Sequence, residues 1–320
     1  MTTKKQIAKI IKRTIPSLEE RGVTTKDVLQ KAQSVNNDEF YTRYEDVEKE
    51  LKMYPKSIWK NKVVFCNCDD AVNSTDRNTS AFALYFLTKF NELGLKKLIC
   101  THYAGKVDLF NQGPKGYIFT KFGFNEMDTK KEYPKNYTGS FDDPLSLKIL
   151  NEDADIVCTN PPFSRAIDYW RILIESGKRF IIISNITNPI TPAFIPYFMK
   201  GKVWAGYHEV DWFLTPKREM TRAAGYWYTN VPIKNRPKYK QLKIIPLKEI
   251  PEENKQYDDH KVLLVKKCYI PSDYKKPFAV SARAILNGLL EKGYEIVKDN
   301  QYFPYVNGKK CFGRVLVKKM

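Results

Sequence analysis

Short apolar runs alternate with longer helical patterns along the first part of the chain. KVVFCNCDD at residues 62–70 is a β-rich run that ends in polar residues, and the apolar helical stretch SAFALYFLTKFNELG follows at 80–94, closed by a glycine. A second β-rich run, KKLICTHY, occupies residues 96–103. This order predicts a strand, a helix and another strand.

The same unit returns after a less regular stretch, rich in glycine and lysine, at residues 105–140. ADIVCTNPPF at 154–163 predicts a strand and a loop, RAIDYWRILIESG at 165–177 a helix, and KRFIIISNI at 178–186 a further strand. Strands that alternate with helices need crossover connections. We therefore expect a doubly wound α/β fold with a mainly parallel sheet.

Two of the predicted strands end in polar loops, at residues 66–70 and 160–163. In parallel α/β sheets, ligands bind beyond the carboxyl ends of the strands. Adjacent central strands would place these loops side by side, so we expect the functional site there.

The two ends of the chain depart from this alternation. Residues 1–35 hold eight basic and three acidic side chains with weak helical periodicity, which predicts a basic helical extension that packs on the main domain or contacts nucleic acid. NNDEFYTRYEDVEKELKMY at 36–54 predicts a capped helix. Towards the C-terminus, GYWYTNVPI (225–233) and FGRVLVKKM (312–320) predict strands and AILNGLLEKG (284–293) a helix.

The composition predicts a folded protein with a polyanionic partner. Apolar residues make up 42% of the 320 residues, which excludes a disordered chain. The excess of 54 Lys and Arg over 36 Asp and Glu gives a net charge of +18 and favours nucleic acid, with a generally basic surface as the alternative. No apolar run approaches the ~18 residues of a membrane span, and no signal peptide is evident, so we expect no membrane and a cytoplasmic location.

The cysteines and histidines give no metal signal. Neither a CxxC pair nor a Cys/His set at ligand spacing occurs, so we expect reduced thiols, mostly buried, and no metal. The residues concerned are Cys66, Cys68, Cys100, Cys158, Cys268 and Cys311, with His102, His208 and His260, whose roles are expected to be structural or on the surface.

The tetrapeptide NPPF carries the clearest chemistry. Two successive prolines stiffen the loop and lack N–H donors, so its carbonyls stay available as acceptors. The side-chain oxygen of Asn160 and the carbonyl of Pro161 can accept both hydrogens of an exocyclic base amine, which favours the developing tetrahedral nitrogen. Beyond Pro162, Phe163 offers a face for stacking the base. A plain strand-to-helix turn is the alternative.

This motif resembles the fourth motif of amino-methyltransferases that use S-adenosylmethionine. From about residue 36 to residue 320, the chain resembles the EcoRI-type adenine-specific (N6) DNA methyltransferase family. The resembling segments follow the same order: DEFYT (38–42), KVVFCNCDD (62–70), LGLKKLI (93–99), DIVCTNPPFS (155–164), YWYTN (226–230) and VNGKKCFGRVLV (306–317).

The resemblance implies a class I, Rossmann-like methyltransferase fold with S-adenosylmethionine as methyl donor. Residues 36–232 would form the catalytic domain, and 233–320 a basic target-recognition region with closing elements. The implied activity is site-specific methylation of adenine N6, by direct transfer to an adenine flipped out of double-stranded DNA. A cognate restriction endonuclease would act as a separate protein.

The resemblance also implies a binding site for the donor. Phe40, Tyr41 and Thr42 would lie over its methionine end, and the loop Cys66, Asn67, Cys68, Asp69 would form the floor. The glycines usual in that loop are missing. The acid that usually binds the ribose after the second strand is missing too, so the ribose-binding residue stays open.

A third donor-binding position falls in GSFDDP. We select Asp142 as the residue that faces the adenine of the donor, with Ser140 and Asp143 as alternatives. A purely structural turn explains the same residues.

Basic and aromatic residues are interleaved between Trp212 and Leu247, where only one acid, Glu219, occurs. Such a mixture is typical of nucleic-acid contacts. The residues expected to bind DNA are Lys217, Arg218, Arg222, Lys234, Arg236, Lys238 and Lys240, and the three arginines are candidates for reading guanine.

Two other functions fit the same motifs. Related Asn-Pro-Pro-aromatic loops serve RNA adenine and protein-glutamine methyltransferases, and a non-catalytic DNA-binding protein could keep a methyltransferase fold. The recognition sequence and the oligomeric state stay open.

Overall fold

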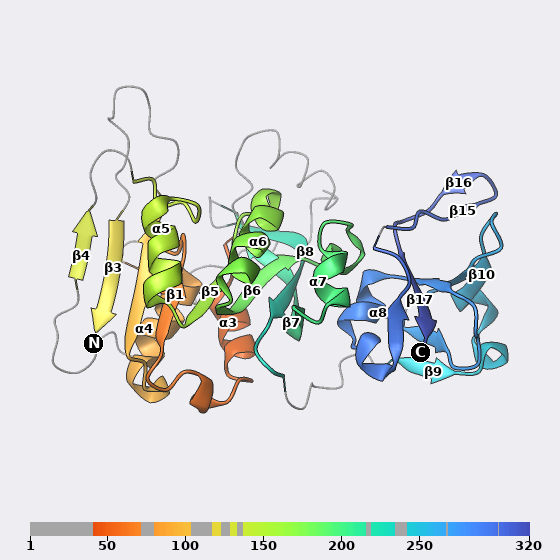
Figure 1. Ribbon diagram of the computed structural model, residues 1–320, viewed down its shortest axis with the longest axis horizontal. Coiled ribbons are helices and arrows are strands. Elements are labelled where there is room, and N and C mark those ends of the chain that lie inside the picture. Colours follow the sequence, from red (N-terminus) through yellow and green to blue (C-terminus); the bar gives the residue numbers. More distant parts are fainter. Residues whose placement is uncertain are drawn as a thin grey trace, which may run out of the picture. The chain divides into compact units, whose positions relative to one another are not determined.

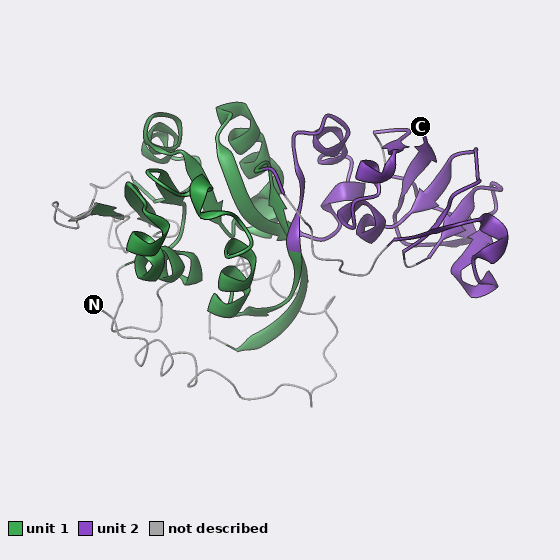
Figure 2. Ribbon diagram, turned by 90° about the horizontal axis from the view of Figure 1, so that it is seen from below, with its two compact units in different colours: residues 1–184, 208–231 green, residues 185–207, 232–320 purple. Residues whose placement is uncertain are grey.

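The computed structural model describes residues 41–71, 80–103, 117–122, 129–132, 137–215, 219–233, 242–266, 268–299 and 301–320. The described chain divides into two compact units, one made of residues 1–184 with 208–231 and the other of 185–207 with 232–320 (Figure 2). Unlike the predicted division after residue 232, this one groups residues 185–207 with the C-terminal unit. The predicted extension 1–35 lies outside the described residues.

Unit 1 is built on an eight-stranded sheet with the strand order β4-β3-β2-β1-β5-β6-β8-β7 (Figure 1). Its centre consists of β2 (Lys97–His102), β1 (Val63–Cys66), β5 (Ile156–Thr159) and β6 (Arg179–Asn185). These neighbours pair in parallel. All residues of β1 and β5 are buried, as expected of central strands covered on both faces. The strands predicted from the apolar runs are therefore confirmed.

The sheet edges differ from a uniformly parallel arrangement. β3 (Tyr117–Phe122) pairs antiparallel with β2, and β4 (Thr129–Glu132) pairs antiparallel with β3. The stretch treated as irregular in the sequence thus contains two strands, which need no crossover helix because antiparallel neighbours can be joined by a loop. β8 (Met220–Thr229) and β7 (Trp204–Leu214) complete the opposite edge. The fold is mixed α/β with a large, mostly parallel sheet.

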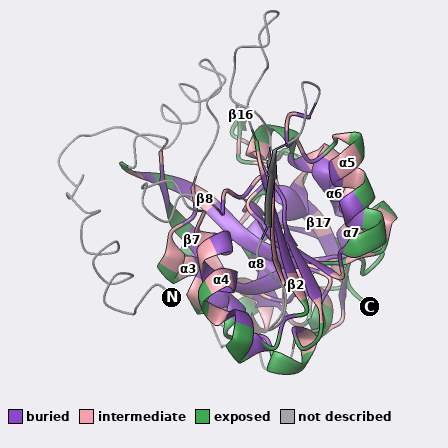
Figure 3. Ribbon diagram, turned by 90° about the vertical axis from the view of Figure 1, so that its left-hand side faces the viewer, coloured by how far each residue is buried: buried purple, intermediate pink, exposed green. Residues whose placement is uncertain are grey.

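Helices cover both faces of this sheet, with α3 and α4 on one side and α5 and α6 on the other (Figure 3). Two successive residues of β8 contact helices on opposite faces of the sheet. Trp227 packs on Phe82 of α4 (Ala81–Leu93), and Tyr228 packs on Trp170 of α6 (Ala166–Ser176). Successive side chains of a strand point to opposite faces, so β8 joins both helical layers to one core.

Local sequence explains where the helices begin and end. Ser80 caps α4 by accepting a hydrogen bond from the backbone of Phe82, and Gly94 closes it in the left-handed conformation. Gly177 closes α6 in the same way. The helix predicted over 36–54 is shorter, however. It is α3, Tyr44–Leu51, because the backbone of Tyr41 is already paired with β7.

Unit 2 contains a five-stranded sheet with the order β10-β11-β13-β17-β14. Its strands are β10 (Lys255–Tyr257), β11 (Leu263–Val265), β13 (Phe278–Val280), β17 (Val315–Lys319) and β14 (Tyr294–Ile296). Two smaller pairs join β9 (Lys243–Ile245) to β12 (Tyr269–Pro271) and β15 (Tyr305–Val306) to β16 (Lys309–Lys310). The predicted final strand is confirmed as β17.

Short helices complete both units. They are α5 (Pro144–Lys148) in unit 1, and α7 (Ile195–Met199) and α8 (Ala282–Leu286) in unit 2, with the single turns η1 (Lys56–Ile58), η2 (Ile149–Asp153), η3 (Phe163–Arg165), η4 (Asn188–Ile190), η5 (Leu247–Glu249), η6 (Glu252–Asn254) and η7 (Leu290–Lys292). The helix predicted over 284–293 is interrupted: α8 ends at Leu286, Gly288 adopts a φ of 86°, and the single turn η7 follows. Among the described helices, none has both the length and the apolar character needed to cross a bilayer.

Candidate functional site

The two polar loops predicted to form a site lie side by side. β1 and β5 are neighbours, with Phe65 opposite Val157. Just beyond the paired residues, the Thr159 hydroxyl donates a 2.7 Å hydrogen bond to the carbonyl oxygen of Asn67. The loop after β1 and the Asn160 loop after β5 are therefore joined where both strands end.

The turn after β1 is stabilised without a glycine. Cys68 adopts a φ of 61°, a left-handed conformation that costs a non-glycine residue about 1 kcal/mol. Its backbone N–H donates to the Thr101 hydroxyl on β2 (2.9 Å), and this hydroxyl donates to Asn67 Oδ1 (2.8 Å). Each such bond contributes about 1 kcal/mol, so the neighbouring strand offsets the cost of the turn.

Asp69 is a buried carboxylate at the centre of this loop. Its Oδ1 accepts a hydrogen bond from the Ser80 hydroxyl, whereas its buried Oδ2 meets no donor in hydrogen-bond geometry among the described residues. Burial raises the pKa of Asp69 to about 7; the hydroxyls of Ser80 and Thr159 lower it and Asp70 raises it. Thr159 lies nearby but gives its proton to Asn67 instead.

The loop at residues 137–143 closes over the ends of β1 and β2. Gly139 has a φ of 76°, and a Cβ added there would lie 1.8 Å from the carbonyl oxygen of His102. Only glycine fits this approach of two backbones. The Cys68 thiol donates to the carbonyl of Gly139 (3.4 Å), so the predicted segment GSFDDP meets the loop after β1.

Within this loop, Asp143 has the structural role. Its Oδ2 accepts hydrogen bonds from the backbone and hydroxyl of Thr138, at 2.9 and 2.7 Å, and from the backbone of Ser140 at 3.2 Å. These bonds fold the segment that places Gly139 against β2. The alternative assignment of Asp143 to donor binding stays a prediction.

Asp142 is tied to the Asn-Pro-Pro-Phe loop instead. Its Oδ2 accepts a 2.7 Å bond from Nη2 of Arg165, the last residue of η3, and its Oδ1 accepts from the Ser140 hydroxyl. The Arg165 guanidinium, which also lies 4.5 Å from the ring centroid of Phe141, holds the pKa of Asp142 below its ordinary value. The role of Asp142 towards the donor stays a prediction.

The Asn-Pro-Pro-Phe loop itself is held from both sides. Asn160 Oδ1 and Pro161 are buried, and the backbone of Arg165 donates to the carbonyl of Pro162 (3.1 Å), which forms η3. The ring of Phe163 meets the ring of Phe213 on β7 edge to face, with centroids 5.8 Å apart. The stacking residue is therefore oriented by a strand more than forty positions later in the chain.

Phe213 in turn depends on β8. A Cβ at Gly225 would lie 2.7 Å from its ring, so glycine leaves the space that Phe213 fills. Sequence reasoning assigned neither residue to this site. YWYTN was read as part of a predicted strand and as a segment of the family resemblance, and nothing local shows that Gly225 supports a residue on the neighbouring strand.

The predicted segment after Phe40 attaches beside Phe213. Tyr41 and Leu214 exchange two backbone hydrogen bonds of 2.8 Å. The next residue, Thr42, is buried, and its hydroxyl meets no partner in hydrogen-bond geometry among the described residues. Phe40 lies outside the described residues.

Most of the predicted DNA contacts fall outside the described part of the chain. Arg222 is exposed on β8. The others, Lys217, Arg218, Lys234, Arg236, Lys238 and Lys240, are not among the described residues. This set stays a prediction.

The histidines have separate environments. His208 is buried with Nδ1 2.7 Å from Oε2 of Glu50, and the other oxygen of this carboxylate, Oε1, accepts a bond from the Tyr54 hydroxyl. His102 has Nδ1 3.4 Å from the carboxylate of Asp70. Within the described ranges, no cluster of three His, Cys, Asp or Glu residues could hold a metal ion.

A mostly parallel sheet with polar loops at the tips of adjacent strands places the chain in the class of α/β proteins, whose ligands generally bind beyond the carboxyl ends of the strands. The comparison with known proteins narrows this class. The family model described as adenine-specific methyltransferase EcoRI matches residues 28–318, and the chain belongs to this family. The resemblance inferred from the colinear segments is confirmed.

Individual relatives agree with this assignment. The chain is 29% identical to the Type II methyltransferase M.EcoRI of Escherichia coli over 333 residues, which cover 93% of this chain and 98% of the relative. It is 33% identical to M.MpnI of Mycoplasma pneumoniae and 35% identical to M.MgeORF184P of Mycoplasma genitalium, each over 177 residues that cover 55% of this chain and 50% of the relative. No solved structure matches the chain.

Proposed function

We propose that this protein is a Type II DNA methyltransferase that moves a methyl group from S-adenosylmethionine to N6 of an adenine in duplex DNA. The observation that carries the proposal is the hydrogen bond between Thr159 and Asn67, which holds the acceptor loop at Asn160 beside the loop that ends in buried Asp69. The family description and the names of the relatives support the reaction type and the base.

The residues at the strand tips fit this donor. Its methionine end carries an ammonium group, and Asp69 Oδ2 is a buried acceptor that meets no donor in hydrogen-bond geometry among the residues the structure describes. The Thr42 hydroxyl is a second such group. The donor supplies an electrophilic methyl carbon. A parallel centre with β8 inserted between β6 and β7 fits a class I methyltransferase fold.

The acceptor loop would activate and orient the base. Asn160 Oδ1 and the Pro161 carbonyl accept the two N–H bonds of the adenine amine, which raises electron density on nitrogen and directs its lone pair. Phe163, held by Phe213, stacks on the ring. In-line attack by this nitrogen on the methyl carbon would form the N–C bond as the sulfonium S–C bond breaks. The donor would leave as a neutral thioether, and the extra proton on nitrogen would pass to water.

No covalent enzyme intermediate is needed for this transfer. Burial raises the pKa of the Cys66 and Cys158 thiols well above their ordinary value, so both remain protonated and weakly nucleophilic. The target adenine has to leave the duplex to reach the loop, at an expected cost of a few kcal/mol. The net charge of +18 supports strong, salt-dependent binding to the DNA backbone.

Substitution of Asn160 tests the proposal directly. Asn160→Ala should lower the rate of methyl transfer by roughly 10²–10³-fold, as the loss of one charge-stabilising partner does elsewhere, while calorimetry shows donor binding nearly unchanged. Asn151→Ala is the matched control, because Asn151 is exposed in η2. Full activity of Asn160→Ala would remove the assigned role.

Labelled donor identifies the substrate class. Incubation with duplex DNA, structured RNA and protein should transfer label to DNA alone, and modified-base sequencing should then show N6-methyladenine at one sequence. Label in RNA or protein only would overturn the proposal. DNA binding without donor binding would instead indicate a non-catalytic protein.

A further inference from the structure

A small hairpin in unit 2 carries side chains that the proposed reaction does not use. β15 and β16 pair antiparallel, with Tyr305 opposite Lys310 (Figure 1). Asn307 and Gly308 form the turn between them, with φ values of 51° and 71°. Left-handed conformations at both central residues are typical of tight two-residue hairpins with an Asn-Gly turn. We use "the hairpin" for residues 301–314.

The tip of the hairpin is fixed by one carboxylate. Asp259 Oδ1 accepts from the backbone of Asn307, and its Oδ2 accepts from the backbone of Gly308, both at 2.9 Å. The backbone of Asp259 also donates to the carbonyl of Tyr305 (2.8 Å). Three bonds from one residue hold the turn against the loop between β10 and β11.

The base of the hairpin is anchored in the sheet. Tyr302 and Arg314 exchange two backbone bonds of 2.8 Å, and Arg314 Nη1 donates to the carbonyl of Val265 (2.7 Å) on β11. The Tyr302 hydroxyl donates to the buried carboxylate of Asp258. The hairpin is thus a firmly held projection of unit 2.

This projection exposes large rings between lysines. Phe312 is 93% exposed, and Phe303 and Tyr305 are exposed by about two fifths. Lys309 and Lys310 are exposed, and Lys310 Nζ lies 4.0 Å from the ring centroid of Phe303. Exposed aromatic side chains on an ordered element indicate a binding surface. Because the two adjacent lysines lie between Tyr305 and Phe312 in the hairpin sequence, the partner should combine negative charge with flat apolar faces, as nucleic acid does.

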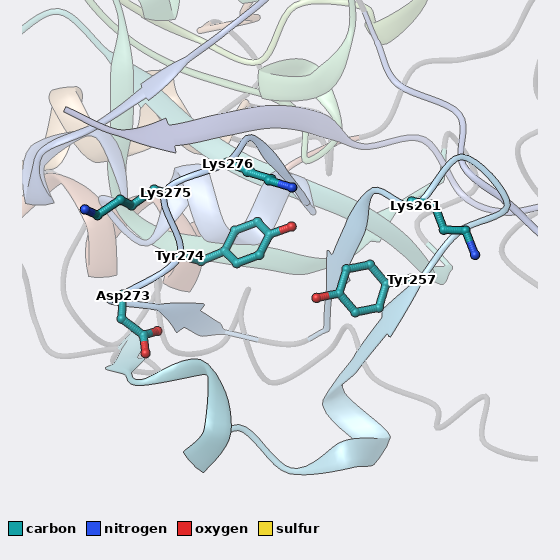
Figure 4. Close-up of a pocket in the computed structure, with 6 residues that line it drawn as sticks. All are labelled: Tyr257, Lys261, Asp273, Tyr274, Lys275 and Lys276. Carbon is teal, nitrogen blue, oxygen red and sulfur yellow. The ribbon is translucent and has the colours of Figure 1, made fainter.

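A pocket beside the loop between β10 and β11 also combines aromatic rings with lysines. Its volume is about 570 Å³, and it is lined by Tyr257, Lys261, Asp273, Tyr274, Lys275 and Lys276 (Figure 4). Asp273, the one acid among them, accepts a bond from the backbone of Leu247. The three lysines therefore dominate the charge of the pocket, which complements a phosphate backbone.

We infer that the hairpin is a DNA-binding element: Phe312 stacks on bases, Lys309 and Lys310 bind phosphates, and the adjacent pocket receives a further stretch of the backbone. This inference rests on the proposed function, because it takes the substrate to be DNA. It assigns the contact to residues outside the basic region at 212–247.

Charge reversal on the hairpin tests the phosphate contacts. In the full-length protein, Lys309→Glu with Lys310→Glu should weaken binding to a duplex containing the methylated sequence at least tenfold at 0.1 M salt. The slope of log affinity against log salt should fall by about two, one for each lost contact. The control pair Lys292→Glu with Lys298→Glu makes the same charge change at exposed positions of unit 2 outside the hairpin and should have a small effect.

Substitution of Phe312 tests the stacking. Phe312→Ala should lower affinity roughly 5–100-fold, the range measured for loss of one base-stacking ring, and Phe312→Tyr should restore most of it. Permanganate reactivity of thymines near the site should fall in parallel. Met199→Ala is the control, because Met199 is also an exposed apolar residue of unit 2. Thermal midpoints should be unchanged, since Phe312 packs against little.

The outcomes separate this inference from the proposed function. If the wild-type protein methylates and binds DNA but the hairpin variants behave like the controls, the inference is overturned and the proposed function remains. Absence of DNA binding by wild type would overturn both. Loss of self-association in hairpin variants, with normal DNA affinity, would assign the hairpin to a second copy of the chain and also overturn the inference.

Discussion

The loop after β1 in unit 1 and the hairpin in unit 2 share a turn conformation but differ in the side chains that they bury or expose. Both contain non-glycine residues with positive φ, Cys68 in one and Asn307 in the other, and each turn is fixed by a neighbouring side chain. The first loop buries polar groups, among them Asp69, whereas the second exposes aromatic ones, above all Phe312.

This difference fits the two binding roles proposed above. A buried carboxylate oxygen without a donor suits a small cationic group that can enter the protein. An exposed ring among lysines suits a large polyanion that cannot. Substitutions in the buried loops of unit 1 and in the exposed hairpin therefore test this difference.

The largest effect is expected from the charge on Asp69. Its pKa is raised from 3.8 to about 7, so the folded protein binds this proton more tightly than the unfolded chain does. Between about pH 4 and 7 the unfolded chain has lost the proton and the folded protein still holds it, so the free energy of unfolding falls as pH rises. The total loss is roughly 4 kcal/mol, at about 1.4 kcal/mol per pKa unit.

Asp69→Asn removes this component. Urea unfolding at several pH values measures the free energy of unfolding of both proteins. The two values should be similar near pH 4, and the variant should become increasingly more stable than wild type as the pH rises to 8. A difference that does not change with pH would mean that Asp69 is not buried as a titrating group.

The next effect compares two glycines. Gly139→Ala should destabilise the protein by about 3 kcal/mol, because the new Cβ meets the carbonyl of His102 at a residue with positive φ. Gly308→Ala has a similar φ, but nothing lies within 4 Å of its Cβ, so about 1 kcal/mol is expected. Denaturant unfolding measures both, and equal costs would show that crowding at Gly139 is unimportant.

The smallest effect is expected at Cys68. Cys68→Gly relieves the left-handed conformation but adds freedom to the unfolded chain and removes the thiol bond to Gly139, so stability should change by less than about 1 kcal/mol. Donor affinity, measured by calorimetry, should stay within a few-fold of wild type. A large loss of affinity would show that the thiol itself contacts the donor.

Local pattern was sufficient for the centre of the fold. Apolar runs located β1, β2, β5 and β6, and glycines marked the ends of α4 and α6. Their alternation also predicted that the loops at Asn67 and Asn160 would be neighbours. These features depend on residues close together in sequence and on the topology of parallel sheets.

The missed features depend on contacts between distant residues. Phe163 is positioned by Phe213, which needs the space at Gly225, and no short motif contains all three. Asp142 and Asp143 look equivalent in the sequence, and only the fold shows that Asp143 holds the turn. β3 and β4 were not predicted because the sequence of their stretch shows no helical pattern of the kind that separated the other predicted strands.

The hydroxyl of Thr159 has a consequence for thermal behaviour. It donates to the backbone of Asn67, and Asp69 Oδ2 meets no donor in hydrogen-bond geometry within the described part of the chain. Under the proposed function, the ammonium group of the donor would bind this oxygen, so the bond would contribute free energy to ligand binding and none to folding of the free protein. A donor analogue should then raise the melting temperature in proportion to the logarithm of its concentration, and it should do so more strongly at alkaline than at acidic pH.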